Sequence, residues 1–262
     1  MQRSVRTLGV RNGGTATASS IPAFVPETMG EACTGERCYR CDVRSQSLCS
    51  SLPISELGYL DRIARRQHGP AGATMIHDGA PMNFACNITR GAVRLSRLMS
   101  DGRRQVTGFL FPGDFLGLTR RQNFPFNVEA ITETEYCLFG LNELDTLARD
   151  YPDLRQQLLE MACRELDSAQ DQMLLLGRKS ALERVSSFLL DVFRRQNRWQ
   201  GTDNIVTLHM PRGDIADYLG LTIETVSRTL TRLRQDRIID IRETYSVEIL
   251  TPQGLQELTG NS

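Results

Sequence analysis

The sequence has no long hydrophobic run and no apolar N-terminal leader. No apolar segment in its 262 residues approaches the length of about 18 that a membrane helix requires. The opening segment, MQRSVRTLGVRNGGTATASSIPAF, lacks the hydrophobic centre of a secretory signal. We therefore expect a cytoplasmic protein with no membrane partner.

The chain also lacks net charge, and it has almost no lysine. Its 31 basic residues balance 31 acidic residues, and Lys179 is its only lysine. This balance excludes a basic surface over the whole molecule, so any nucleic-acid contact must be local. The chain shows no Gly-rich phosphate loop after a strand and no metal-type spacing of its three histidines. We therefore expect that the protein is not an enzyme.

What the sequence does have is seven cysteines, four of them in one short segment, CTGERCYRCDVRSQSLC. These are Cys33, Cys38, Cys41 and Cys49. An odd total and a reducing compartment argue against a pure disulfide framework. Spacing alone leaves several readings open. The run from Cys33 to Cys41 matches a plant-type [2Fe–2S] pattern, Cys38-x2-Cys41 suits zinc, and a thiol switch remains.

Two further cysteines, Cys86 and Cys163, stand in apolar surroundings. Free cysteine is among the most buried residue types. We expect both in hydrophobic cores.

The changing pattern of apolar residues along the chain predicts an α+β protein in five parts. A short helix is expected near residues 55–66, after the cysteines, and short apolar runs with Gly and Asp-Gly punctuation then indicate an antiparallel β-roll of the jelly-roll type. The predicted parts are a disordered tail (1–32), a cysteine segment (33–50), a β-roll (51–141), a long dimerisation helix (142–178) and a winged helix-turn-helix domain (179–262).

Within the long helix, apolar residues recur at alternating intervals of three and four. This heptad pattern is typical of a two-helix coiled coil and predicts a homodimer. A helix packed on its own domain is the alternative. Two alanines make the seam marginal, as a switchable dimer requires. The seam positions are Leu159, Ala162, Leu166, Ala169, Met173 and Leu176.

Residues 210–234, MPRGDIADYLGLTIETVSRTLTRLR, have the pattern of a helix-turn-helix. A short helix over 214–219 precedes Gly220, which supplies the positive φ of a tight turn. Thr222 is a good N-cap for the second helix. The alternation over 238–250, with a turn at Glu243 and Thr244, predicts the β-hairpin of a wing.

The start of the second helix carries residue types that read bases. Arg228 can bond guanine, Glu224 can accept from cytosine, and Ser227 permits close approach. Arg232 is a candidate phosphate contact. The remaining candidate DNA contacts are Arg212, Thr222 and Thr225.

The order of these parts resembles the cyclic-AMP receptor protein and FNR superfamily of regulators. The resemblance covers about residues 33–258 and includes ITRGAVRL, GFLFPGDFLG, LLLGRKSALERVSSFL and MPRGDIADYLGLTIETVSR. The FNR branch is the most similar. The cyclic-nucleotide branch is disfavoured because FLGLTRRQNFPFNVEA lacks the family's Gly-Glu and Arg-Ser pairs, so no cyclic nucleotide is expected. The FixK-like branch lacks the cysteine cluster.

In the FNR branch, three N-terminal cysteines and one from the roll hold a [4Fe–4S] cluster. The resemblance maps these ligands onto Cys38, Cys41, Cys49 and Cys137, the last in AITETEYCLFG. The gap between the second and third ligands is longer than in the enteric prototype. Cys33 has no assigned role. The cluster's negative charge calls for neighbouring cations, and the interleaved arginines Arg37, Arg40 and Arg44 are candidates, opposed by Asp42.

The resemblance implies an oxygen-sensing transcription regulator. Cluster assembly under low oxygen would favour dimerisation and binding to palindromic DNA with TTGAT-like half-sites, with RNA polymerase as a partner. The turn over 100–105, SDGRRQ, is a candidate polymerase contact. The alternatives are a zinc- or thiol-dependent regulator of the same superfamily and, in another class, an iron–sulfur electron carrier or enzyme.

Overall fold

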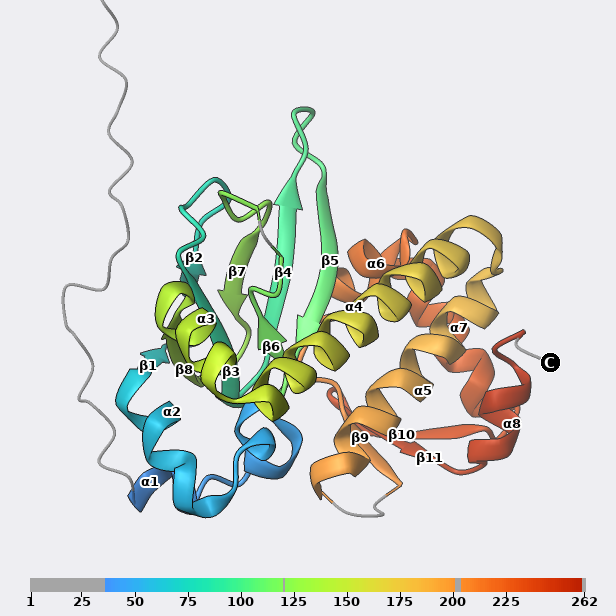
Figure 1. The fold of residues 1–262 in the computed structure, drawn as a ribbon. Coiled ribbons are helices and arrows are strands. Elements are labelled where there is room, and N and C mark those ends of the chain that lie inside the picture. The colour runs from blue at the N-terminus through green and yellow to red at the C-terminus, as the bar shows by residue number, and fades with distance from the viewer. Residues whose placement is uncertain (1–35, 120, 201–203, 261–262) are drawn as a thin grey trace, which may run out of the picture.

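The computed structural model describes residues 36–119, 121–200 and 204–260. The predicted tail and Cys33 lie outside the described residues. The predicted fold class is confirmed: a β-roll is followed by a long helix and a winged helix-turn-helix domain (Figure 1).

The β-roll consists of two four-stranded antiparallel sheets. Large apolar side chains such as Phe124, Ile88 and Val128 fill the space between them. Gly91 makes the tight turn between Arg90 and Val93 with a φ of 89°, which favours glycine. A Cβ at this position would also clash with the carbonyl oxygen of Glu133. In sheet order the strands are β1 (Ala64–Gly69), β8 (Thr134–Gly140), β3 (Phe84–Arg90) and β6 (Phe115–Leu116), then β2 (Thr74–Ile76), β7 (Asn127–Ala130), β4 (Val93–Leu98) and β5 (Arg104–Leu110).

The cysteine segment folds into short helical turns beside the first sheet (Figure 1). Leu48 and Leu52 anchor it in a core with Phe139 of β8. The helix expected over 55–66 is shorter, because the chain becomes extended at Ala64 and continues as β1, which pairs with β8. The turns are α1 (Glu36–Tyr39), η1 (Arg44–Gln46), η2 (Leu48–Ser51), η3 (Ile54–Glu56) and α2 (Leu57–Ile63).

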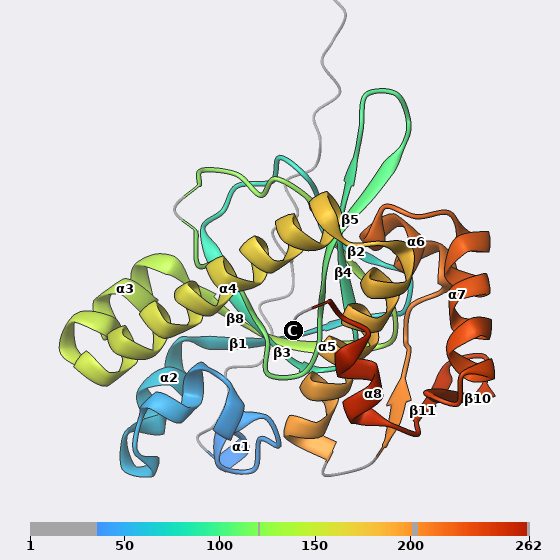
Figure 2. The same ribbon diagram turned by 90° about the vertical axis from the view of Figure 1, so that its right-hand side faces the viewer.

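The single helix expected over 142–178 is two helices, α3 (Leu141–Asp150) and α4 (Pro152–Arg178). Tyr151 between them has φ −119° and ψ 95°. The ring of a proline disfavours helical geometry in the preceding residue, so Pro152 ends α3 and begins α4. From there α4 runs from the roll to the helix-turn-helix domain (Figures 1 and 2).

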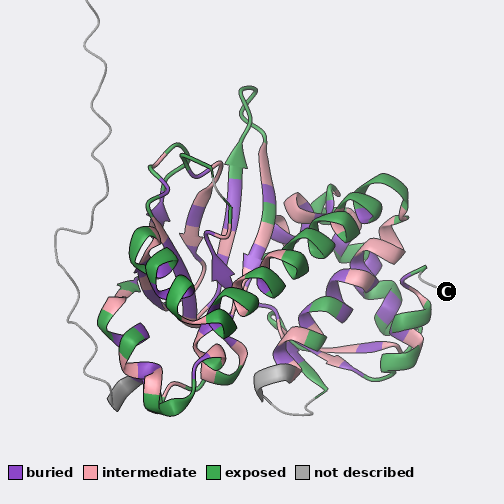
Figure 3. Cartoon of the chain, in the orientation of Figure 1, coloured by how far each residue is buried: buried purple, intermediate pink, exposed green. Residues whose placement is uncertain are grey.

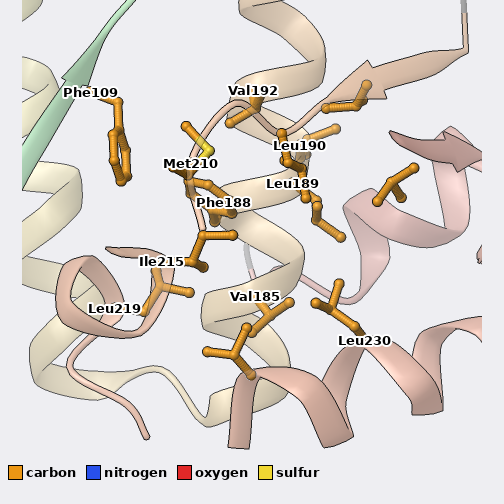
Figure 4. Close-up of a cluster of buried hydrophobic side chains, with 14 of the residues drawn as sticks. Phe109, Val185, Phe188, Leu189, Leu190, Val192, Met210, Ile215, Leu219 and Leu230 are labelled. Atoms are coloured by element: carbon orange, nitrogen blue, oxygen red, sulfur yellow. The ribbon is translucent and has the colours of Figure 1, made fainter. Parts of the chain in front are cut away.

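The C-terminal domain is built around a hydrophobic core. In it, Val185 and Phe188 of α5 pack against Ile215 and Leu230 of the two helices of the helix-turn-helix (Figure 4). The predicted wing is present as an antiparallel hairpin, β10 with β11. The elements are α5 (Ala181–Gln200), β9 (Ile205–Thr207), α6 (Arg212–Leu219), α7 (Ile223–Gln235), β10 (Ile239–Glu243), β11 (Ser246–Ile249) and α8 (Pro252–Glu257).

The roll and the C-terminal domain share this core. Phe109 of β5 lies against Tyr218 of α6, with ring centroids 5.3 Å apart. It also lies near Phe188 of α5, at 6.1 Å between centroids (Figure 4). The β-roll and the C-terminal domain are therefore packed together through apolar contact. Among the described residues, no helix is both long and apolar enough to cross a membrane.

Candidate functional site

Four cysteines from three separate parts of the chain line one pocket. Cys38 lies in α1, Cys41 follows it, Cys49 lies in η2, and Cys137 lies in the middle of β8. Packing of Leu48 against Phe139 brings the N-terminal turns onto the sheet that carries Cys137. The structure thus brings together all four cysteines that the resemblance selected.

Local hydrogen bonds hold the N-terminal cysteines in place. The Cys38 thiol donates to Oδ1 of Asp61 on α2 at 3.0 Å, and both residues are buried. The hydroxyl of Ser47 caps η2 by accepting from the backbone N–H of Cys49 at 3.3 Å. These bonds fix the turns that carry Cys38 and Cys49 at the edge of the pocket.

The rest of the pocket wall is partly polar, and sequence reasoning missed these residues. Apolar atoms come from Leu60, Ala64 and Phe139, and polar side chains come from Arg66, Asn87 and Thr89. The strand register places Cys137 opposite Arg66 on β1 and opposite Asn87 on β3. No sequence signal links these positions, because their proximity depends on the register of β8 with both neighbouring strands.

Burial disfavours a free thiolate at Cys49. None of the described cysteines forms a disulfide. Burial raises the pKa of the Cys49 thiol to about 11, although the nearby charge of Arg44 acts in the opposite direction. A reactive redox thiol requires a lowered pKa. Binding to a metal centre would supply the free energy for the deprotonation that burial opposes.

The pocket cysteines form a donor set of one kind. Within the described residues, no three His, Cys, Asp or Glu side chains are grouped as ligands of one metal ion. Cysteine thiolates bind structural zinc and also iron–sulfur clusters. A [4Fe–4S] cluster takes four cysteine thiolates, and the four cysteines that line this pocket match that ligand set in number and type.

The two remaining cysteines differ from each other. Cys86 is fully buried between the sheets, as expected, and burial raises its pKa to about 12. The prediction that Cys163 is buried is wrong, because it is exposed on α4. It follows seam residue Ala162, and α4 turns this side away from its own domain.

The α4 helix has two apolar faces with different surroundings. Its inner residues Leu154 and Met161 pack with Leu48 and Leu52 of the cysteine segment. Its seam is open to solvent in the single chain (Figure 3). The large seam residues Leu159, Leu166 and Met173 are 59%, 58% and 66% exposed.

The alternative of a seam packed on its own domain is therefore wrong for these three residues. The smaller members vary more: Ala162 is half-buried, whereas Ala169 and Leu176 are exposed.

The reader helix α7 presents its first two turns to solvent. Gly220 has φ 61°, and the Thr222 hydroxyl accepts from the N–H of Thr225, as predicted. Glu224, Ser227 and Arg228 are all exposed. A hydrogen bond from its own backbone N–H, and a second from the Thr222 hydroxyl, lower the pKa of Glu224, which keeps the carboxylate anionic.

Two arginines assigned to DNA occupy different settings. Arg232 is exposed and lies 3.7 Å from the carboxylate of Asp236, a pair that DNA phosphate can replace. Arg212 is half-buried at the start of α6, and burial lowers its pKa. Its Nη1 atom is buried without a hydrogen-bond partner among the described residues.

Comparison with known proteins gives the same architecture. A Crp-like helix-turn-helix domain matches residues 183–258, and a cyclic nucleotide-binding domain matches residues 66–151. The nitrogen fixation regulation protein FixK of Bradyrhizobium diazoefficiens is 39% identical over 86% of this chain and 94% of its own length. The chain belongs to the Crp/FNR family of transcription regulators.

Relatives within the Crp/FNR family carry several names. The transcriptional activator protein FnrL of Cereibacter sphaeroides is 38% identical over 78% of this chain and 84% of its own. The transcriptional activator protein Anr of Pseudomonas protegens is 33% identical over 86% and 93%. The solved structure of FixK2 from Bradyrhizobium japonicum superposes with a TM-score of 0.71 at 35% identity, covering 76% of this chain and 99% of that one.

These similarities identify a family of DNA-binding transcription regulators. They include both FixK and FnrL names, so they do not choose between the two branches. That choice depends on the cysteine pocket.

The predicted polymerase-contacting turn is only partly free in this Crp/FNR-family chain. Arg104 donates to Asp217 of α6 at 2.9 Å, and the Gln105 amide donates to the backbone carbonyl of the same residue at 2.7 Å. Leu98 and Met99 at the hairpin tip are exposed. The base of the turn thus joins the roll to the reader domain, and the tip projects beyond it (Figure 1).

Proposed function

We propose that this protein is an oxygen-responsive transcription regulator of the cytoplasm that holds a [4Fe–4S] cluster on Cys38, Cys41, Cys49 and Cys137. The observation that carries the proposal is that these four cysteines line one pocket. The cluster supplies sensitivity to dioxygen, because its loss in air reports the oxygen level. The protein residues supply the ligands, the burial and the link to DNA binding.

Ligation would order the N-terminal turns on the sheet. The free energy of metal binding stabilises whichever conformation brings the ligands together. The turns that carry Cys49 also carry Leu48 and Leu52, which pack on Leu154 and Met161 of α4. Firm placement of this segment therefore fixes the inner face of α4 and, through it, the orientation of the exposed seam.

A fixed seam favours the homodimer, because a marginal interface gains most when its helix needs no further ordering. Two recognition helices then face successive major grooves of palindromic DNA. TTGAT-like half-sites present guanine and thymine edges, which suit Arg228 and Ser227. The exposed hairpin tip near Met99 is the proposed contact for RNA polymerase.

Spectroscopy of protein purified without oxygen tests the proposal. The expected result is a brown chromophore with four irons and four sulfides per chain, as the cluster formula requires. Changing any one of the four pocket cysteines to Ala should abolish the chromophore. Cys163→Ala is the matched control, because Cys163 is exposed on α4 away from the pocket.

The same measurement separates the alternatives. Zinc gives bound metal without visible colour, and a thiol switch gives neither metal nor colour. A chromophore that survives Cys137→Ala would remove that residue from the ligand set. Air exposure should convert dimers to monomers and weaken binding to the palindrome. Unchanged DNA affinity after air exposure would refute the oxygen-sensing role.

The match to a cyclic nucleotide-binding domain raises the question of whether a cyclic nucleotide binds the β-roll. We propose that the roll takes no cyclic nucleotide. Cyclic AMP and cyclic GMP should leave the thermal midpoint of the clustered protein unchanged. A concentration-dependent rise in that midpoint would show binding to the native state and contradict the proposal.

A further inference from the structure

Cys137 lies between two polar side chains in the sheet. The register of β8 pairs it with Arg66 of β1 on one side and with Asn87 of β3 on the other. Directly paired residues of antiparallel strands project from the same face of a sheet. All three residues line the pocket that the N-terminal cysteines cover.

Burial of the polar Asn87 side chain at this position destabilises the folded chain. Its side chain is 2% exposed, and its Oδ1 atom is buried without a hydrogen-bond partner among the described residues. Its neighbours on the same strand face and in the pocket include Ala85 and Phe139, which are apolar. A buried amide with an unpaired atom is less stable than an apolar side chain of the same size. The amide therefore requires a partner that the folded chain alone does not provide.

We propose that Asn87 is a positioning residue that donates an N–H hydrogen bond to the sulfur of Cys137 when that sulfur is a ligand. The inference rests on the proposed cluster site. Rotation of the amide by half a turn exchanges Oδ1 and Nδ2 with almost no change of shape, so the amide can present a donor to the pocket. Arg66 adds positive charge on the opposite side of the same sulfur.

The charge of Arg66 and the N–H donor of Asn87 together offset the negative charge of the thiolate ligands on the buried side of the pocket. Hydrogen bonds to ligand sulfurs and nearby charge set the reduction potential of an iron–sulfur centre. A donor stabilises the electron-rich sulfur and makes removal of an electron by dioxygen less favourable. Asn87 therefore sets how long the sensor keeps its cluster in air, without being a ligand itself.

Asn87→Leu tests the proposal, because Leu has nearly the shape of Asn and cannot donate. After anaerobic reconstitution, the variant should contain as much iron and sulfide as the unaltered protein. Its visible absorption should decay about fivefold faster in air-saturated buffer, the ratio that one ordinary hydrogen bond is worth. Asn87→Asp, which adds a charge in place of a donor, should decay faster still. Thr89→Val is the matched control, since Thr89 lines the pocket but is not paired with Cys137.

The thermal midpoint of the cluster-free protein gives a second readout. Without the cluster, Asn87→Leu should melt at the same or a higher temperature, because it removes an unpaired buried amide. A lower midpoint would show that Asn87 serves the fold alone and would overturn the proposal. Equal decay of Asn87→Leu and the unaltered protein would overturn it as well. Failure of the unaltered protein to take up iron would instead refute the cluster itself, so the two failures are distinguishable.

Discussion

The carboxylate of Asp214, on the first helix of the helix-turn-helix, accepts a hydrogen bond from Arg94 of the β-roll at 2.7 Å. The Asp214 side chain is 2% exposed, and Arg104 of the adjacent strand binds its other oxygen. Both arginines also bind a second acid, Glu129 for Arg94 and Asp217 for Arg104. The helix-turn-helix domain is thus connected to the roll by a partly buried ionic network as well as by the apolar contact of Phe109.

Asp214→Asn should destabilise the fold. The change removes a buried anion and leaves Arg94 and Arg104 partly unpaired, which should lower the free energy of unfolding by about 2 kcal/mol. Urea unfolding monitored by circular dichroism measures the loss. Asp240→Asn on the wing is the control, because Asp240 forms a solvent-exposed pair with Arg242 and should change the same quantity by less than about 0.5 kcal/mol. Equal losses in the free energy of unfolding for the two variants would show that the network contributes no more than an exposed ion pair.

Glu129 predicts a dependence of stability on pH. Its carboxylate accepts from Arg94 at 2.9 Å and from the Ser96 hydroxyl at 2.7 Å. The hydrogen bond from Arg94 is the main cause that holds its pKa below the ordinary value of 4.5. Because the folded pKa is the lower one, the stabilisation is present above pH 4.5 and is lost as the pH falls through the folded value.

Thermal melting of the unaltered protein and Glu129→Gln should therefore converge in acid. At neutral pH the variant should melt at a lower temperature, and the gap should narrow below pH 4.5. Because Glu129 is partly exposed, the gap at neutral pH should be modest. A gap that stays constant down to strong acid would contradict the assignment of Glu129 as the titrating group.

The exposed seam of α4 predicts the effect of charge on dimerisation. Leu166→Lys should leave the single chain folded, because Leu166 is 58% exposed, but should abolish the dimer of the clustered protein. Sedimentation under anaerobic conditions measures the mass. The matched control is Leu174→Lys, since Leu174 is 51% exposed on the same helix but lies off the heptad seam. Loss of the dimer in both variants would refute the predicted seam.

The two kinds of arginine on α7 should differ in what they do to DNA binding. Arg228→Ala should cost about 1–3 kcal/mol on the palindrome and relax the preference for one base pair, as expected for a residue that bonds a base edge. Arg232→Ala should weaken binding equally for all sequences and reduce the salt dependence by about one ion. Fluorescence anisotropy with the palindrome and a single-base variant measures both. Unchanged base preference in Arg228→Ala would remove it from the reading set.

Features that depend on neighbours in the sequence were predictable. The turn at Gly220, the cap at Thr222 and the apolar spacing from Ile215 to Leu230 all occur as expected, because helix periodicity and turn chemistry are local. The large seam residues are exposed as a coiled-coil seam requires. The break at Tyr151 was also open to prediction, since Pro152 was visible in the sequence.

The amino-acid sequence was sufficient to select a cysteine-rich segment and a helix-turn-helix as candidate sites, and resemblance to a family added Cys137. Only the tertiary structure decided what surrounds that chemistry. The register of three strands places Arg66 and Asn87 beside Cys137, and the outward side of α4 leaves Cys163 exposed. The physical reason is that cross-strand neighbours and helix orientation arise from packing between segments far apart in the chain, which periodicity does not record.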